Sequence, residues 1–193
     1  HLKALKNDSF VVLEKDKNGD YYAIHQRFHQ IHSLQSLIGS EAYQNFIPQE
    51  ERSSLVRAYS KRLFGEDKKL SLEAAHKWSR WESALVRLFP GVYDMSDEEA
   101  LAMAKAECHY FLHKCFFKDD NYILNNCDKI KDLPCTIVQG RYDMDCPPFS
   151  AYKLHKKLPK SNLNIVLFGG HSSMEPGLVD GLVRAAEDHK KFF

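Results

Sequence analysis

Apolar residues recur along this chain at two spacings, the alternation typical of strands and the three-to-four-residue spacing typical of amphipathic helices. Near the start, two apolar runs with Asn18–Gly19 between them predict a hairpin of strands 9–14 and 21–25. Helical spacing follows over residues 50–64 and 71–88, and Ser96–Glu99 is a capping box that opens a third helix. The first two thirds of the chain are therefore predicted to be mainly helical.

The last third has a different pattern, in which short apolar runs alternate with helical segments. It predicts a strand at 133–139, a helix at 149–158, a strand at 162–168 and a helix at 178–193. Strands in this order are parallel and joined by a right-handed crossover. Because two parallel strands do not make a stable sheet alone, partner strands must come from elsewhere. The predicted fold class is α/β, with this βαβα unit as the C-terminal part of a larger parallel sheet.

Two glutamates interrupt the apolar stripes of consecutive predicted helices. Glu82 continues the stripe that contains Trp78 and Leu85, and Glu107 continues the stripe of Ala100, Ala104, Phe111 and Cys115. An ionised carboxylate buried without a partner costs several kcal/mol. Each glutamate could pair with an Arg or Lys of a neighbouring helix, or reach water at the edge of the stripe. Two such residues in succession favour a site that binds a positive group.

Composition excludes some classes of partner. The 193 residues carry 27 basic and 26 acidic side chains, for a net charge of +1, so we expect neither nucleic acid nor an anionic membrane surface as a partner. The five cysteines are odd in number and form no C-x-x-C pair, which favours reduced thiols in a cytoplasmic protein. No apolar run is long enough to predict a membrane span.

Three histidines have a spacing that would suit metal binding. His25, His29 and His32 would line one face of a helix. No Cys, Asp or Glu completes a ligand set there. We therefore interpret this segment as a polar amphipathic stretch, and we predict neither a metal nor a cofactor.

An acid and a histidine follow the two predicted strands of the last third. Asp143 and Asp145 come after the first strand, and His171 follows the second strand in a Gly-Gly-His sequence. Either acid could reach His171 across the carboxyl edge of a parallel sheet, orienting a histidine base. No G-x-S-x-G nucleophile motif occurs in the sequence. Ser172 and Ser173 do not lie on such an elbow, and we interpret Cys146 as a small buried filler rather than a nucleophile.

The motifs as a set resemble those of the proline iminopeptidases, serine exopeptidases of the α/β-hydrolase fold with a helical cap. The similarity runs from about residue 41 to the C-terminus. It rests on four motifs, Trp78–Glu82, Glu107–Phe111, Gly140–Asp143 with Cys146–Pro147, and Gly170–Ser172 with Glu175–Pro176.

The resemblance implies a role for five residues. Asp143 would be the acid of the catalytic triad and His171 the general base. Glu82 and Glu107 would hold the free α-amine of the substrate, and Phe111 would form a wall of the proline pocket. A free α-amine is mostly protonated at neutral pH, so two enclosed carboxylates suit it.

We therefore expect an incomplete α/β-hydrolase with a helical cap. The expected segments are an N-terminal hairpin or irregular part at 1–40, the cap at 41–128 and the C-terminal part of the hydrolase domain at 129–193. The expected function is release of N-terminal proline from peptides. Because the nucleophile elbow and the oxyanion segment of the family are absent, we expect no peptidase activity from this chain by itself.

Two other functions stay open. A truncated hydrolase relative could serve as a binding or assembly module without catalysis, and its unpaired strand edges would favour self-association. A different α/β-hydrolase, such as an esterase or an epoxide hydrolase, could share the Asp and the His. Neutral substrates do not need two enclosed carboxylates, which disfavours this last reading.

Overall fold

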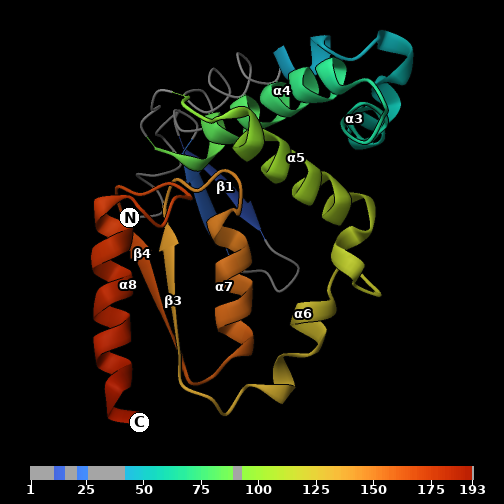
Figure 1. Ribbon diagram of the computed structural model, residues 1–193. Helices are drawn as coiled ribbons and strands as arrows, with labels where there is room; N and C mark the ends of the chain where they lie inside the picture. Colours follow the sequence, from blue (N-terminus) through green and yellow to red (C-terminus); the bar gives the residue numbers. More distant parts are fainter. Residues whose placement is uncertain (1–10, 16–20, 26–41, 89–92, 193) are drawn as a thin grey trace.

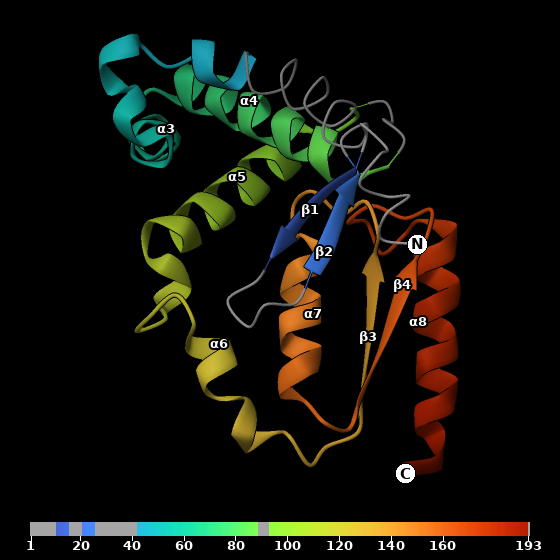
Figure 2. The same ribbon diagram turned by 180° about the vertical axis from the view of Figure 1, so that it is seen from behind.

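The computed structural model describes residues 11–15, 21–25, 42–88 and 93–192. A layer of helices lies over the upper end of a small parallel sheet, and helices α7 and α8 flank the two strands of that sheet in both views (Figures 1 and 2). Both strands direct their carboxyl ends toward the helical layer (Figure 1). Side chains that follow these strands therefore lie beneath the helices.

Among the described residues, the helical layer includes the 3₁₀ turn η1 (Gln49–Ser54) and the α-helices α3 (Leu55–Leu63), α4 (Lys68–Val86) and α5 (Asp97–Leu112). The helix expected at 50–64 is thus divided, because Ser54 is extended with φ of −148°. The helix α4 begins before the expected Ser71, since the Asp67 carboxylate caps it by accepting the N–H of Leu70. The capping box of Ser96 and Glu99 is confirmed.

One position of the predicted stripe on the third helix was wrong. The helix α5 ends at Leu112, and Cys115 lies beyond it in a short 3₁₀ turn, η2 (Lys114–Phe116). All three residues of this turn have positive φ, with values of 50°, 53° and 61°. A left-handed backbone cannot continue a right-handed helix, so Cys115 does not share a face with Ala104.

The core of the helical layer is built on aromatic and small side chains. Tyr43 and Tyr59 stack with ring centroids 4.2 Å apart, and the Tyr59 hydroxyl donates to the Tyr43 carbonyl at 2.7 Å. Trp78 packs edge-on against both rings and is almost fully buried. Alanines of α4 and α5 let the two helices approach closely around this cluster. Burial of the aromatic rings thus orients the faces of α4 and α5 that carry the glutamates.

The C-terminal part confirms the predicted βαβα order. After α6 (Tyr122–Asn125) and η3 (Cys127–Lys129) come β3 (Cys135–Gly140), α7 (Pro148–Lys157), β4 (Ser161–Val166), α8 (Pro176–His189) and η4 (Lys190–Phe192). The strands β3 and β4 are parallel, with Cys135 opposite Ser161 and Gly140 opposite Val166. The loops that follow them therefore emerge side by side.

The predicted hairpin is also present. The strands β1 (Val11–Lys15) and β2 (Tyr21–His25) pair antiparallel, and among the described residues they form a sheet separate from β3 and β4. Its turn lies outside the described residues, as do His29 and His32. Because His25 ends a strand, the expected helical histidine face does not begin there.

Gly140 is expected to tolerate no side chain. A Cβ atom at this position would overlap the carbonyl oxygen of Gly170 and would lie 2.6 Å from that of Gly169. Since both obstacles are backbone atoms, the loop that carries His171 would have to move. We expect Gly140→Ala to lower the free energy of unfolding by about 1–3 kcal/mol or more, measured by urea denaturation. The exposed Ser150→Ala change on α7 is the control, and equal stability of the two variants would contradict the expectation.

Candidate active site

Asp143 is held as a fixed acceptor in the loop after β3. Its side chain is only 6% exposed. One oxygen, Oδ1, accepts the backbone N–H groups of Asp145 at 3.1 Å and Cys146 at 2.7 Å, and Oδ2 accepts the side-chain amide of Gln139 at 3.0 Å. Three donors on one carboxylate stabilise its charge and prevent it from rotating. The loop is thus built around an oriented anion.

His171 meets this anion from the loop after β4. Its Nδ1 lies 3.1 Å from Oδ2 and 3.2 Å from Oδ1 of Asp143. A proton on Nδ1 is donated to the carboxylate, which leaves Nε2 as the nitrogen that can accept a proton. The structure thus brings together the acid and the base that the sequence separates by 28 positions.

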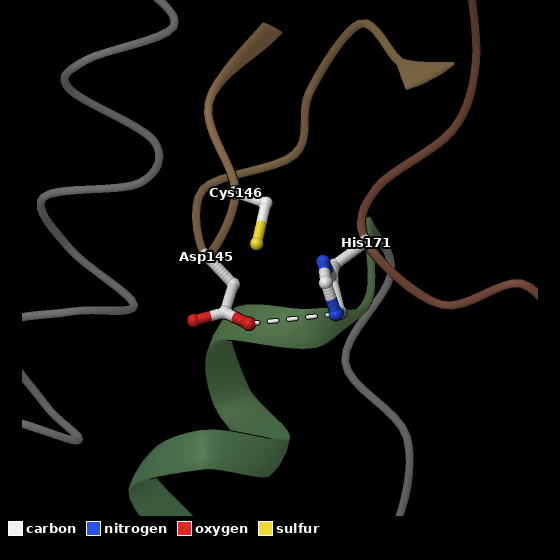
Figure 3. A group of neighbouring side chains, drawn as sticks. All are labelled: Asp145, Cys146 and His171. Carbon is white, nitrogen blue, oxygen red and sulfur yellow. Dashed lines mark ion pairs between the residues drawn. The ribbon is translucent and has the colours of Figure 1, made fainter. Parts of the chain in front are cut away.

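Asp145 contacts the other side of the same ring. Its Oδ2 lies 3.4 Å from Nε2 of His171 (Figure 3). The two aspartates therefore do not compete for one nitrogen, because Asp143 takes Nδ1 and Asp145 faces Nε2. The sequence left open which acid reaches His171, and in the structure both do.

Cys146 completes the only group of side chains in the described segments that has the spacing of metal ligands. The ligand atoms of Asp145, Cys146 and His171 lie within 4.8 Å of one another (Figure 3). Although Cys146 as a whole is exposed, partial desolvation of its sulfur, followed by the charges of Asp145, Asp143 and Glu82, raises the pKa of its thiol. A metal binds the thiolate rather than the thiol, so a raised pKa weakens this candidate. The residue is exposed rather than buried, so its interpretation as a buried filler was wrong.

Glu82 is buried in α4, within electrostatic reach of Asp145 and His171. Its side chain is 8% exposed. Burial, together with the charges of Asp145 and Glu107, raises its pKa to about 7, while His171 opposes the shift. Among the described residues, no lysine or arginine forms an ion pair with Glu82. In the part of the chain that the structure describes, the alternative that an Arg or Lys of a neighbouring helix pairs with this carboxylate is therefore not observed.

The backbone of the same helix end holds the histidine loop. The carbonyl oxygen of Val86, one helical turn after Glu82, accepts the N–H groups of His171 at 3.0 Å and Ser172 at 2.8 Å. The loop that carries His171 is therefore hydrogen-bonded to the last turn of α4, the same turn that carries Glu82.

Glu107 and Phe111 lie one turn apart on α5. The Glu107 carboxylate accepts the indole N–H of Trp78 at 2.7 Å. Burial and Asp145 raise its pKa, although the Trp78 hydrogen bond opposes this. The Phe111 ring stacks on Trp78 with centroids 6.0 Å apart and is 49% exposed. A half-open apolar wall therefore stands beside a carboxylate.

The buried acid makes stability depend on pH. Because the pKa of Glu82 rises from 4.5 to about 7 on folding, the folded state binds the extra proton. Stability is then lost as pH rises between these values. Glutamine does not titrate, so Glu82→Gln should escape this loss. We expect the difference in free energy of unfolding, variant minus wild type, to be about 2 kcal/mol larger at pH 8 than at pH 5 when both are measured by urea denaturation. The exposed Glu73→Gln change on α4 is the control, and a difference that does not depend on pH would contradict the assignment.

Sequence reasoning missed two parts of this site. Gln139, which orients the Asp143 carboxylate, was counted only as part of a strand, although an amide at the end of an apolar run is a signal. Val86 acts through its carbonyl group. Every residue has a carbonyl, so no sequence signal could have revealed it.

The fold and the Asp–His pair together define the class of the molecule. Adjacent parallel strands that present an acid and then a histidine at their carboxyl edge, below a layer of helices, are a part of an α/β-hydrolase. No helix in the described parts of the chain combines the length and apolar character needed to cross a membrane.

Comparison with known proteins narrows the class. The chain is 44% identical to a probable proline iminopeptidase of Leptolyngbya boryana over 151 residues, 76% of this chain and 47% of the relative. It is 44% identical to a proline iminopeptidase of Arabidopsis thaliana over 155 residues, 78% of this chain and 41% of the relative. A proline iminopeptidase of Neisseria gonorrhoeae is 41% identical over 156 residues, 79% of this chain and 50% of the relative. The matched part of the chain is thus related to the proline iminopeptidases.

The relationship covers a part of those proteins. The chain spans about half the length of the curated relatives it matches. No protein-family model matches it.

Proposed function

We propose that this chain is the cap and C-terminal catalytic part of a proline iminopeptidase, an enzyme that releases proline from the N-terminus of peptides. The observation that carries the proposal is the buried Glu82 carboxylate, which has no ion-pair partner among the described residues and lies within electrostatic reach of His171, the histidine hydrogen-bonded to Asp143. Residues 41–128 would form the cap and residues 129–193 the hydrolase part. The 41–44% identity to the three relatives supports the same function.

The residues of the chain can divide the reaction between them. The ammonium group of the substrate would lie between Glu82 and Glu107, with its proline ring against Phe111. A serine hydroxyl, which the G-x-S-x-G motif would supply, attacks proline's own carbonyl carbon while Nε2 of His171 takes its proton. Asp143 keeps the proton of the imidazole on Nδ1. His171 then gives the first proton to the departing amine, and water hydrolyses the proline ester by the same route.

Binding at the amine end explains why the product would be a single residue. Two carboxylates enclosed beside the base stabilise a charged N-terminus and offer nothing to a blocked one. The same two groups disfavour the reading as an esterase for neutral substrates.

This chain alone is proposed to be inactive, because it has no G-x-S-x-G motif. The test is a proline anilide assay on the longest natural product of the gene, together with labelling by a serine-directed phosphonate. Release of the anilide with labelling supports the proposal. A product that contains the elbow and folds, yet cleaves a nitrophenyl ester and no proline anilide, would refute it.

The five free cysteines agree with a reducing compartment such as the cytoplasm.

A binding or assembly module is the second candidate. In the described part of the chain the sheet of β3 and β4 has no third strand, and apolar side chains near it are exposed, including Leu167, Phe168 and Val183. Such a surface favours association. A stable oligomer in light scattering, with no phosphonate labelling at any length of the gene product, would favour this candidate over the enzyme.

A further inference from the structure

Four hydrogen bonds lie at the junction between the end of the cap helix α4 and the loop that carries His171, and three of them cross it. Two of them are the bonds from His171 and Ser172 to the Val86 carbonyl. The other two end on one carboxylate, since Glu175 accepts the N–H of Leu88 through Oε1 at 2.7 Å and the N–H of Gly170 through Oε2 at 2.6 Å. One side chain therefore bridges segments that are 87 and 5 positions away from it along the chain.

The two backbones meet closely at this junction. A Cβ atom on Gly170 would lie 2.8 Å from the nitrogen of Leu88 and 3.2 Å from the Val86 oxygen. Such a close approach leaves no space for water between the end of α4 and the loop that carries His171. The backbone N–H groups at the junction therefore need hydrogen-bond acceptors within the protein. The carboxylate of Glu175 supplies two of these partners, and hydrogen bonds to a charged acceptor are the stronger kind.

Glu175 lies where its carboxylate could cap its own helix instead of bridging the junction. It is the N-cap residue of α8, but its side chain makes no capping hydrogen bond to that helix. A carboxylate at this position could satisfy the free N–H groups of its helix. Here it reaches instead across the junction, to the residue before His171 and to the second residue after the end of α4.

We propose that Glu175 is a positioning residue that holds the buried acid of α4 and the histidine of the sheet edge in one arrangement. Its bond to Leu88 anchors the end of the helix that carries Glu82, and its bond to Gly170 anchors the residue next to His171. The consequence for amine binding rests on the proposed function, whereas the anchoring of both segments does not.

The anchoring is tested on this chain with Glu175→Gln, which keeps the shape of the side chain. A carboxamide has one acceptor oxygen, so one of the two N–H groups loses its partner. We expect backbone hydrogen exchange at Gly170 or Leu88 to accelerate at least about tenfold. We also expect the downfield proton signal of the Nδ1–H···Asp143 hydrogen bond to weaken. The control is Glu187→Gln on the same helix, where the exposed carboxylate pairs with Lys190 at 2.7 Å.

Two results would overturn the proposal. Wild-type exchange at both amides shows that Glu175 does not anchor them. An unchanged His171 signal together with faster exchange shows a merely local role. Should Glu175→Gln fail to fold, Glu175→Asp replaces it, because the shorter side chain keeps the charge and loses the reach to one of the two amides.

Binding of L-prolinamide, followed by NMR titration of the same proteins, tests the link to the amine site. We expect Glu175→Gln to bind it at least about fivefold more weakly than the wild type. Equal affinity of the two proteins would overturn the link. Absence of binding by the wild type would count against the proposed function instead, while the exchange and the His171 signal still decide the anchoring.

Discussion

Replacing Asp143 by asparagine is expected to lower kcat for proline anilide about ten-thousandfold in a gene product that carries the nucleophilic serine. The structure gives the reason. Two backbone N–H groups, of Asp145 and Cys146, donate to Oδ1, whereas the side-chain amide of Gln139 alone donates to Oδ2. The oxygen of the asparagine therefore stays at the Oδ1 position, and its NH₂ group takes the place of Oδ2, from which the Gln139 amide must turn away. That NH₂ group then donates to Nδ1 of His171 and forces the imidazole proton onto Nε2. In this tautomer the histidine cannot accept the proton of the serine.

This expectation separates a catalytic role from a structural one. KM should change little, because Asp143 contacts no part of the proposed substrate. The control is Asp132→Asn, an exposed acid shortly before β3 whose carboxylate lies 3.9 Å from Nζ of the exposed Lys160. A folded Asp143→Asn enzyme with more than a tenth of the wild-type kcat would show that another group orients His171.

Changing Glu82 and Glu107 together to glutamine is expected to lower kcat/KM for proline anilide at least about a hundredfold. An ammonium group enclosed beside two neutral amides keeps the cost of leaving water and loses its counter-charges. Hydrolysis of a nitrophenyl ester without an α-amine should change less than about threefold, since it uses only the triad. The difference between the two substrates, measured on the same preparation, is the quantity to compare.

The same experiment carries a dependence on pH. Because Glu82 has a pKa of about 7, it is mostly protonated below neutrality and mostly charged above. Wild-type kcat/KM for the amine substrate should therefore fall as pH drops below about 7, and the ester activity should not show the additional loss.

The matched control is Glu73→Gln with Glu98→Gln. These residues are exposed on the same two helices and share the same chemical change. Full activity of the Glu82 and Glu107 double variant on proline anilide would remove the amine-binding assignment.

Local signals predicted the elements well where they are strong. The capping box at Ser96 and the alternation of short apolar runs with helices after residue 132 both lie within a few neighbouring residues. The failures were at boundaries. The helix α5 stops before Cys115 because three residues, Lys114, Cys115 and Phe116, have left-handed backbone angles. A glycine would have predicted such a turn, but none of these three residues favours positive φ.

The candidate site was predictable as a set of residue types and only partly as an arrangement. Asp143, His171 and Glu82 were recognisable because a charged or titratable side chain at a strand end or in an apolar stripe is unusual. Asp145 and Glu175 were visible in the sequence as well, yet nothing local says that one faces Nε2 and the other bridges Leu88 to Gly170.

The sequence by itself determined which groups could do chemistry here, namely a carboxylate followed by a histidine after neighbouring strands, and two acids in apolar helix faces. Tertiary structure alone decided their relations: which aspartate takes which ring nitrogen, that Glu82 meets no arginine or lysine among the described residues, and that α4 ends against the histidine loop. The physical reason is that spacing along a chain controls only neighbours within a few residues. Contacts across 28 or 87 positions depend on how the elements pack.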